Sequence, residues 1–307
     1  MRTQDCTNPI GNGTTLCDYV QQQCNQLEQM GRHRTRETYM TMKRSFLAFN
    51  GQDMALASID ELTINRYEAY LRHERGVCRN TSSFYLRVFR TVYGKAVEDG
   101  LIENKLHFKR VYTGVDKTHK RAITLQDIKT IYNLDLSDSP KKAWARDLFM
   151  FSFYMRGMSF VDMAFLRKTN LHGDMLIYNR RKTGHLMCVK WEPPMQRIID
   201  RYPLPHSPYL LPIIFPGDVD PRRQYLYRIR SINHHLRNLS FQAGISSTLT
   251  TYVARHSWAS IARAKDFPLS VISEGLGHEN EATTRIYLQS IESTQVDIAN
   301  KEILGEL

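Results

Sequence analysis

The side chains best suited to chemistry gather in residues 249–291 of this sequence. Arg255 is followed directly by His256, and Tyr287 comes nine residues after His278. A guanidinium binds phosphate oxygens through its planar fork of N–H donors, and an imidazole can accept or donate a proton near neutral pH. A phenol, with an ordinary pKa of ~10, becomes a nucleophile when a base and nearby cations help it ionise. Together these residue types suit chemistry at a phosphodiester, where cations stabilise the negative charge that builds on the non-bridging oxygens.

The order and spacing of these residues resemble the carboxy-terminal signature of the tyrosine recombinase (phage integrase) family. In that signature an Arg-His pair precedes a helix of small residues, then a Leu-Gly-His, then a Thr-rich turn before a tyrosine. The resemblance implies that Tyr287 is the nucleophile and that Arg255 binds the scissile phosphate. It also implies that His278 handles a proton or contacts the phosphate. His256 is expected to be a packed structural histidine.

A hairpin is expected upstream, because residues 175–191 switch to a strand–turn–strand pattern around Lys182-Thr183-Gly184. This hairpin resembles the small sheet of the family, whose turn carries a catalytic lysine. Lys182 fits that place, as an acid that protonates the departing 5′-oxygen. Arg181 is the competing candidate.

The sequence departs from the family pattern at two positions. Tyr252 stands where the family has a histidine, three residues before Arg255, and Ser159 stands where its first arginine is expected. Arg156 is the nearest substitute, with Arg146 or Arg181 as alternatives. These departures are familiar in integrases of Bacteroides-type mobile elements, which this sequence resembles most.

Length and charge fit two domains that bind a polyanion. A chain of 307 residues with 42% hydrophobic residues can bury more than one core, and its net charge is +11. Its five cysteines form no C-x-x-C pair, so neither a disulfide framework nor a zinc site is indicated. We find no secretory h-region and no long apolar stretch, and expect a soluble cytoplasmic protein, nucleoid-associated when bound to DNA.

Residues 14–108 are expected to form a four-helix core-binding (SAM-like) domain, which the resemblance covers loosely. Each helix is expected to stop at a glycine: Gly31, Gly51, Gly76 and Gly100. Threonines are the expected N-caps: Thr14, Thr35, Thr63 and Thr81. Four cations of the last helix are candidate DNA contacts, although any one of them can equally be a solvated surface charge: Arg79, Arg87, Arg90 and Lys95.

Residues 109–121 are rich in Lys and Arg and are expected to be a basic linker. Residues 122–291 are expected to form a mixed, mostly helical catalytic domain with one small antiparallel sheet. Thr124 with Asp127, and Ser159 with Asp162, predict helix starts of the capping-box type. Residues 292–307 carry a narrow apolar stripe and are expected to dock on a neighbouring protomer, with docking on their own domain as the alternative.

The resemblance implies a mainly α, two-domain, site-specific DNA recombinase for integration, excision or inversion. The family mechanism requires neither metal nor ATP, and no cofactor is expected. Its partners would be duplex DNA with inverted-repeat core sites, three further protomers in a homotetramer on two duplexes, and possible accessory DNA-bending proteins; no membrane partner is expected. The alternative is a catalytically degenerate member that acts as a DNA-binding accessory protein.

Overall fold

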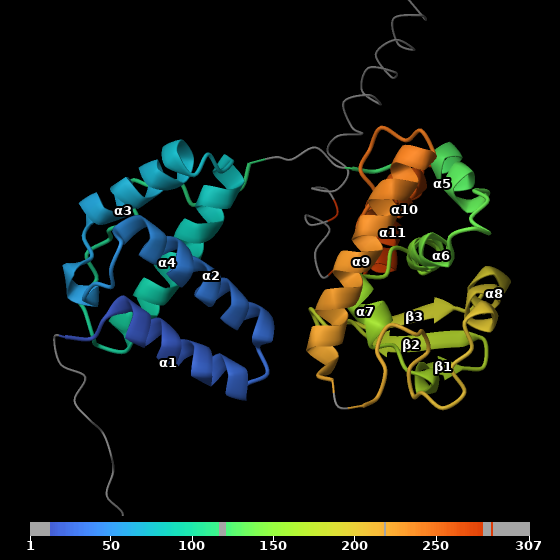
Figure 1. Cartoon of the computed structure of the whole chain (residues 1–307), viewed down its shortest axis with the longest axis horizontal. Coiled ribbons are helices and arrows are strands. Elements are labelled where there is room, and N and C mark those ends of the chain that lie inside the picture. Colours follow the sequence, from blue (N-terminus) through green and yellow to red (C-terminus); the bar gives the residue numbers. More distant parts are fainter. Residues whose placement is uncertain (1–12, 117–120, 218, 279–283, 285–307) are drawn as a thin grey trace, which may run out of the picture. The chain divides into compact units, whose positions relative to one another are not determined.

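The computed structural model describes residues 13–116, 121–217, 219–278 and 284. The chain forms two compact units that divide between residues 118 and 119 (Figure 1). Both are mainly helical, and the second contains one small antiparallel sheet, so the expected fold class is confirmed. The exact domain boundaries given above stay predictions.

The first unit is a bundle of four helices around an aromatic core. They are α1 (Leu16–Gln29), α2 (His33–Asn50), α3 (Glu61–Ala69) and α4 (Arg79–Glu98), with a short 3₁₀ helix η1 (Leu56–Ser58) and a π-helical turn η2 (Tyr70–Glu74). The rings of Phe46, Tyr67 and Phe89 meet edge to face, with centroids 4.9–6.1 Å apart. All three side chains are almost fully buried, so they fix how the helices pack.

Part of the expected linker packs on the first unit. Val111 is buried in its core, and the Ser83 hydroxyl donates to the Gly114 carbonyl at 2.5 Å. The Arg79 guanidinium lies over the Tyr112 ring at 3.7 Å and pairs with the Asp116 carboxylate at 3.5 Å. Residues 111–116 are therefore held against the start of α4.

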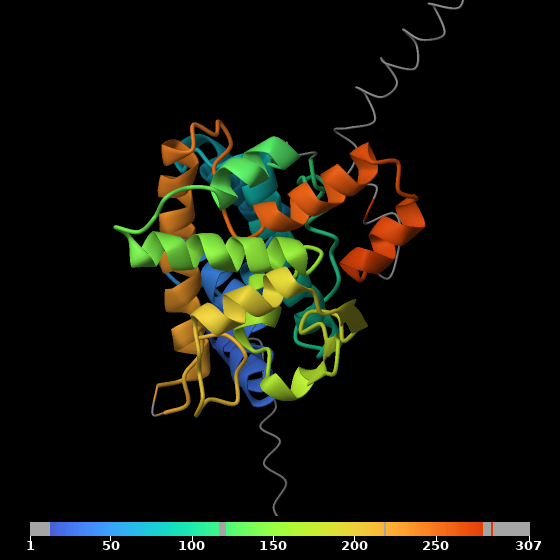
Figure 2. The same ribbon diagram turned by 90° about the vertical axis from the view of Figure 1, so that its right-hand side faces the viewer.

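The second unit surrounds α6 with helices and one sheet. Its helices are α5 (Leu125–Tyr132), α6 (Pro140–Tyr154), α7 (Phe160–Ala164), the 3₁₀ helix η3 (Lys168–Asn170), α8 (Pro193–Arg201), α9 (Pro221–Gln242), α10 (Val253–Ala264) and α11 (Leu269–Leu276). Leu148, Phe149 and Phe151 on α6 are completely buried. Figure 2 shows α6 crossing α9, and contacts with α8 and α10 complete its surroundings.

The sheet has strand order β1-β2-β3 and is antiparallel throughout. Strands β2 (Met175–Asn179) and β3 (Leu186–Lys190) form the expected hairpin, and β1 (Leu171–His172) adds a short third strand. Leu176 pairs with Val189, and Tyr178 with Met187, and all four side chains are buried. The alternation fixes which face of the hairpin turns inward.

Within the described residues, no helix combines the length and apolarity that a membrane crossing needs. The same residues contain no cluster of three or more His, Cys, Asp or Glu side chains placed to hold a metal ion.

Candidate active site

Arg255 is buried at the start of α10, with 4% of its surface exposed. Its Nη1 donates to the Gly157 carbonyl at 3.0 Å, and its Nη2 to the Leu276 carbonyl at 2.5 Å. Gly157 has a φ of +75°, and a Cβ added there would lie 2.5 Å from the Arg255 Cα. Glycine is therefore required at 157 both for its backbone conformation and for the close approach of α10.

His278 follows the end of α11, where Gly277 takes a left-handed conformation with φ 62°. Its Nε2 lies 3.1 Å from the Arg255 Nη2, and its Nδ1 lies 2.7 Å from the Thr284 hydroxyl. A guanidinium has only donors, so Nε2 must be the accepting nitrogen and Nδ1 carries the proton. The structure therefore assigns the Nδ1–H tautomer to His278.

The surroundings of His278 disfavour its charged form. Burial, and then the positive charges of Arg255, Arg180 and Lys182, lower the pKa of the imidazole to about 4. Near neutral pH the ring is uncharged in this arrangement.

Lys182 lies exposed in the turn between β2 and β3. Two backbone hydrogen bonds close this turn. The Gly184 N–H donates to the Arg180 carbonyl at 2.8 Å, and the Arg180 N–H donates to the His185 carbonyl at 2.9 Å. Because Lys182 contributes to the low pKa of His278, the turn lies within electrostatic range of that ring. The structure thus brings Lys182, Arg255 and His278 into one region, although they are far apart in sequence.

Arg180 belongs to the same region and was not among the predicted residues. Its side chain is only 9% exposed, and its Nη1 donates to the Gly277 carbonyl at 2.6 Å. A signal was available, because Leu176 and Tyr178 are the inward residues of β2 and position 180 continues that alternation. The family resemblance pointed instead to the turn residues Arg181 and Lys182.

The structure places Arg156 beside a different set of residues. Arg156 follows α6 with a φ of +55° and lines a cavity of about 500 Å³. The cavity is also lined by α10 and α11 residues, namely Trp258, Ser270, Val271, Glu274 and Gly275. Its predicted role at the phosphate stays a prediction.

The two alternatives to Arg156 have structural contacts of their own. Arg146 pairs with Asp147 at 3.1 Å and donates to the Leu134 carbonyl. The Arg181 guanidinium lies 4.1 Å from the centre of the Phe165 ring.

Tyr252 and Tyr287 complete the predicted set. Tyr252 is the residue before α10, is 46% exposed, and packs edge to face against His256 with ring centroids 4.8 Å apart. Tyr287 lies outside the described residues. Thr284, which is fully buried and contacts His278, is the nearest described residue before it.

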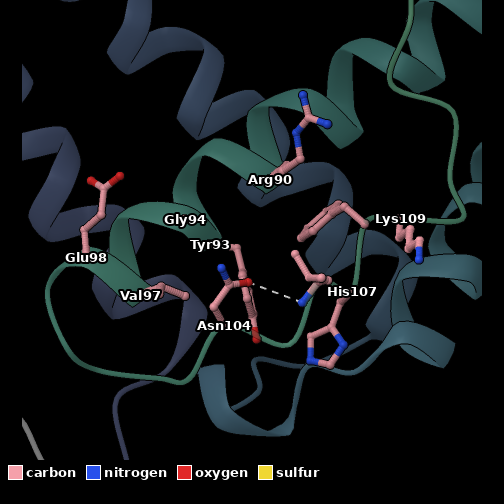
Figure 3. A pocket seen from close by; sticks show the side chains of 10 residues that line it. Arg90, Tyr93, Gly94, Val97, Glu98, Asn104, His107 and Lys109 are labelled. Atoms are coloured by element: carbon pink, nitrogen blue, oxygen red, sulfur yellow. Dashed lines mark hydrogen bonds between the residues drawn. The ribbon is translucent and has the colours of Figure 1, made fainter.

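The predicted DNA-contacting cations of α4 have varied surroundings. Arg79 is held by Tyr112 and Asp116, and Lys95 donates to Gln23 at 3.2 Å. Arg90 donates to Thr113 and lines a cavity of about 460 Å³ with residues 104 and 106–109 (Figure 3). Arg87 is half-buried. Their part in DNA binding stays a prediction.

A second basic surface, which we had not predicted, runs along α9. This helix of 22 residues contains five arginines and no acidic residue. Six of its exposed residues follow one face: Arg223, Tyr227, Arg230, His234, Arg237 and Phe241. The seven-residue spacing of the three exposed arginines, without any intervening acid, was a readable signal. We call these six residues the α9 face.

Comparison with known proteins decides the family. The sequence model of the phage integrase SAM-like domain matches residues 15–111, and that of the phage integrase family matches residues 121–293. The chain belongs to the phage integrase family. The tyrosine recombinase assignment is therefore confirmed, while a search of curated protein sequences found no significant match for this integrase-family chain.

Solved structures share the fold at low sequence identity. A lambda integrase (75–356) dimer bound to a COC′ core site has a TM-score of 0.67 and 15% identity, covering 89% of this chain and 95% of that one. A lambda integrase tetramer bound to a Holliday junction gives 0.64 and 13%, covering 90% and 78%. Tn1549 transposon integrase in complex with a circular intermediate DNA gives 0.64 and 12%, covering 90% and 95%.

Proposed function

We propose that this chain is a site-specific DNA recombinase that breaks and rejoins DNA through a 3′-phosphotyrosyl link to Tyr287. The observation that carries the proposal is the meeting of Arg255, His278 and the Lys182 turn in a chain of this family. A buried guanidinium beside a neutral imidazole suits a phosphate whose charge grows during the reaction.

The proposed reaction exchanges one phosphoester bond for another. The Tyr287 oxygen bonds to phosphorus, and its proton passes to Nε2 of His278, the ring nitrogen with the lone pair. The bond from phosphorus to the 5′-oxygen breaks, and the Lys182 ammonium donates a proton to that oxygen. Arg255 stabilises the charge on the non-bridging oxygens. A 5′-hydroxyl from another strand then reverses these steps.

The phosphotyrosyl bond preserves the energy of the broken linkage, so the scheme uses neither ATP nor a metal ion. Tyr252 is proposed as a hydrogen-bonding side chain at the phosphate, because it lies one helical turn before Arg255. Arg156 is a further predicted cation.

We propose that duplex DNA contacts the α9 face and the α4 cations of the two units. The arginines of the α9 face span about 21 Å at ~1.5 Å per residue, enough to contact several phosphates. By analogy with the lambda integrase structures, the chain would act as a tetramer on two duplexes with inverted-repeat core sites. We further propose integration, excision or inversion of a Bacteroides-type element in the cytoplasm, with accessory DNA-bending proteins.

Covalent capture tests this function for any DNA target sequence. The chain would be incubated with a pool of duplexes that have a randomised arm and a nick beside the candidate scissile phosphate. The nick lets the short 5′-fragment diffuse away and traps the phosphotyrosyl product. Adducts that survive denaturing gels would be recovered and sequenced, and we expect one enriched sequence.

Tyr287→Phe is the matched control because it removes only the hydroxyl. We expect it to bind the enriched duplex with nearly unchanged affinity and to form no adduct. Absence of any adduct with the unaltered chain, despite DNA binding, would favour a degenerate DNA-binding protein. Adducts formed equally by Tyr287→Phe would reject Tyr287 as the nucleophile.

A further inference from the structure

Two buried guanidiniums bind neighbouring carbonyls of one turn. Arg255 Nη2 donates to the Leu276 carbonyl at 2.5 Å, and Arg180 Nη1 donates to the Gly277 carbonyl at 2.6 Å. The two arginines reach this turn from different elements, one from α10 and the other from the end of β2. The next residue along the chain is His278, so both cations lie at the entrance to the proposed phosphate site.

The position of Arg180 is firmly fixed by packing around Gly277. A Cβ added to Gly277 would lie 2.9 Å from the Arg180 Cδ and 2.5 Å from the Met187 Sδ. The β2–β3 hairpin therefore packs directly against the turn, and the Arg180 side chain has little room to move. A guanidinium held in this way is preorganised for a ligand.

Its charge has no partner of opposite sign in the described part of the chain. Arg180 makes no ion pair there, and its one side-chain hydrogen bond is the bond to Gly277. The buried acid closest in this network is Asp162, whose oxygens accept from the Arg181 backbone N–H and the Ser159 hydroxyl at 2.8 and 2.7 Å. Buried charges are normally paired, so an anion is the missing component.

The same contacts place Arg180 close to the position where sequence comparison expects an arginine and finds Ser159. Asp162 bridges the Ser159 hydroxyl to the backbone of Arg181, so the end of β2 is tied to the start of α7. Arg180 is the residue next to this tie. Arg156, by contrast, lines a cavity that it shares with Glu274, a carboxylate that offsets its charge.

We infer that Arg180 contacts the scissile phosphate and supplies the second guanidinium, so that Arg255 and Arg180 each stabilise one non-bridging oxygen. This inference rests on the proposed function. Most of the N–H donors of Arg180 are uncommitted in the described structure, so it can bind an oxygen while it keeps its bond to Gly277. Its contribution to the low pKa of His278 agrees with a position beside that ring.

Replacing one charged oxygen separates contact with the phosphate from support of the fold. The enriched nicked duplex would be made with the normal scissile phosphate, and with each of the two methylphosphonate isomers, in which a methyl group replaces one non-bridging oxygen. Covalent adduct formation would be timed for the unaltered chain and for Arg180→Ala. A cation that contacts the replaced oxygen is no longer needed on the matching isomer.

We expect Arg180→Ala to slow cleavage of the normal duplex by at least ~10²-fold, the scale for loss of one oxyanion donor. On one methylphosphonate isomer it should cleave at nearly the rate of the unaltered chain. Arg181→Ala is the matched control, because it keeps the backbone N–H that binds Asp162, and it should behave normally on all three duplexes.

Equal impairment of Arg180→Ala on all three duplexes would show a purely structural role and overturn the inference, as would normal cleavage of the phosphate duplex. Rescue of Arg156→Ala instead of Arg180→Ala would transfer the role to Arg156. If Arg180→Ala fails to fold, Arg180→Lys provides the same comparison with the charge retained and the fork removed. Failure of the unaltered chain to form adducts would reject the proposed function itself.

Discussion

The guanidinium of Arg255 donates a hydrogen bond to Nε2 of His278 across a distance of 3.1 Å. This contact fixes the tautomer of the imidazole, since Nδ1 must then donate to the Thr284 hydroxyl at 2.7 Å. Thr284 stands three residues before Tyr287, so one chain of hydrogen bonds runs from the buried arginine to the segment that carries the proposed nucleophile.

We expect Thr284→Val to slow covalent adduct formation by about tenfold, while affinity for DNA stays nearly unchanged. The substitution keeps the volume of the side chain and removes the hydroxyl that orients His278, an effect on the scale of misplacing a proton-transfer group. Thr284→Ser keeps the hydroxyl and should restore most of the rate. A valine variant as fast as the threonine would show that the hydrogen bond does not matter.

Acid should destabilise the fold through His278. Its pKa is lowered to about 4 in the folded chain, below the ordinary value of ~6.5 in an unfolded one. Between these two values the unfolded state binds more protons, so stability is lost as the pH falls from about 6.5 through about 4.

The measurement is the urea midpoint of the unfolding transition against pH. His278→Gln should show a shallower loss over this window than the unaltered chain, because it cannot take up the proton. Parallel curves for the two proteins would contradict the assignment of a buried neutral imidazole.

Gly157→Ala should lower the free energy of unfolding by about 2 kcal/mol or more, because it combines a strained backbone with overpacking. Its φ is +75°, and the new Cβ would lie 2.5 Å from the Arg255 Cα. Gly173→Ala is the matched control: it has a similar φ of +60° and nothing within 4 Å, so only ~1 kcal/mol of backbone strain is expected. Similar losses at both positions would show that the contact with α10 is loose.

Removing the three arginines of the α9 face together, as Arg223→Ala, Arg230→Ala and Arg237→Ala, should weaken duplex binding and flatten its salt dependence. The slope of log K against log salt should fall by about 0.9 for each lost phosphate contact. Fluorescence anisotropy between about 50 and 200 mM salt measures this. Arg197→Ala, an exposed cation on α8, should leave the slope unchanged. An unchanged slope for the triple variant would exclude the α9 face from the interface.

Local patterns in the sequence predicted the elements better than their exact starts. The capping box at Thr124 and Asp127 is confirmed, and Ser159 caps α7 as expected. The threonine N-caps of the first unit were wrong, since Thr15, Arg32, Asp60 and Cys78 occupy those positions. Several polar residues lie near each helix start, and packing selects among them. For α3, Asp60 accepts from both the N–H and the hydroxyl of Thr63.

The geometry of the site depends on contacts that no local pattern encodes. Arg255 binds a carbonyl of Gly157, 98 residues away, and Arg180 binds one of Gly277, 97 residues away. A family signature can indicate that Arg255 and His278 belong together. It could not reveal Arg180, because that residue enters the site only through the packing of the hairpin on the turn after α11.

The contacts of Arg255 make it a poor indicator of whether an integrase-family chain still cuts DNA. Its side chain joins the turn after α6 to the turn after α11, so selection for a stable fold alone would keep an arginine there. Lys182 is exposed on a hairpin turn, and nothing in the described fold requires a lysine at that place. A descendant that stopped cleaving DNA but kept its shape should therefore lose Lys182 long before it loses Arg255.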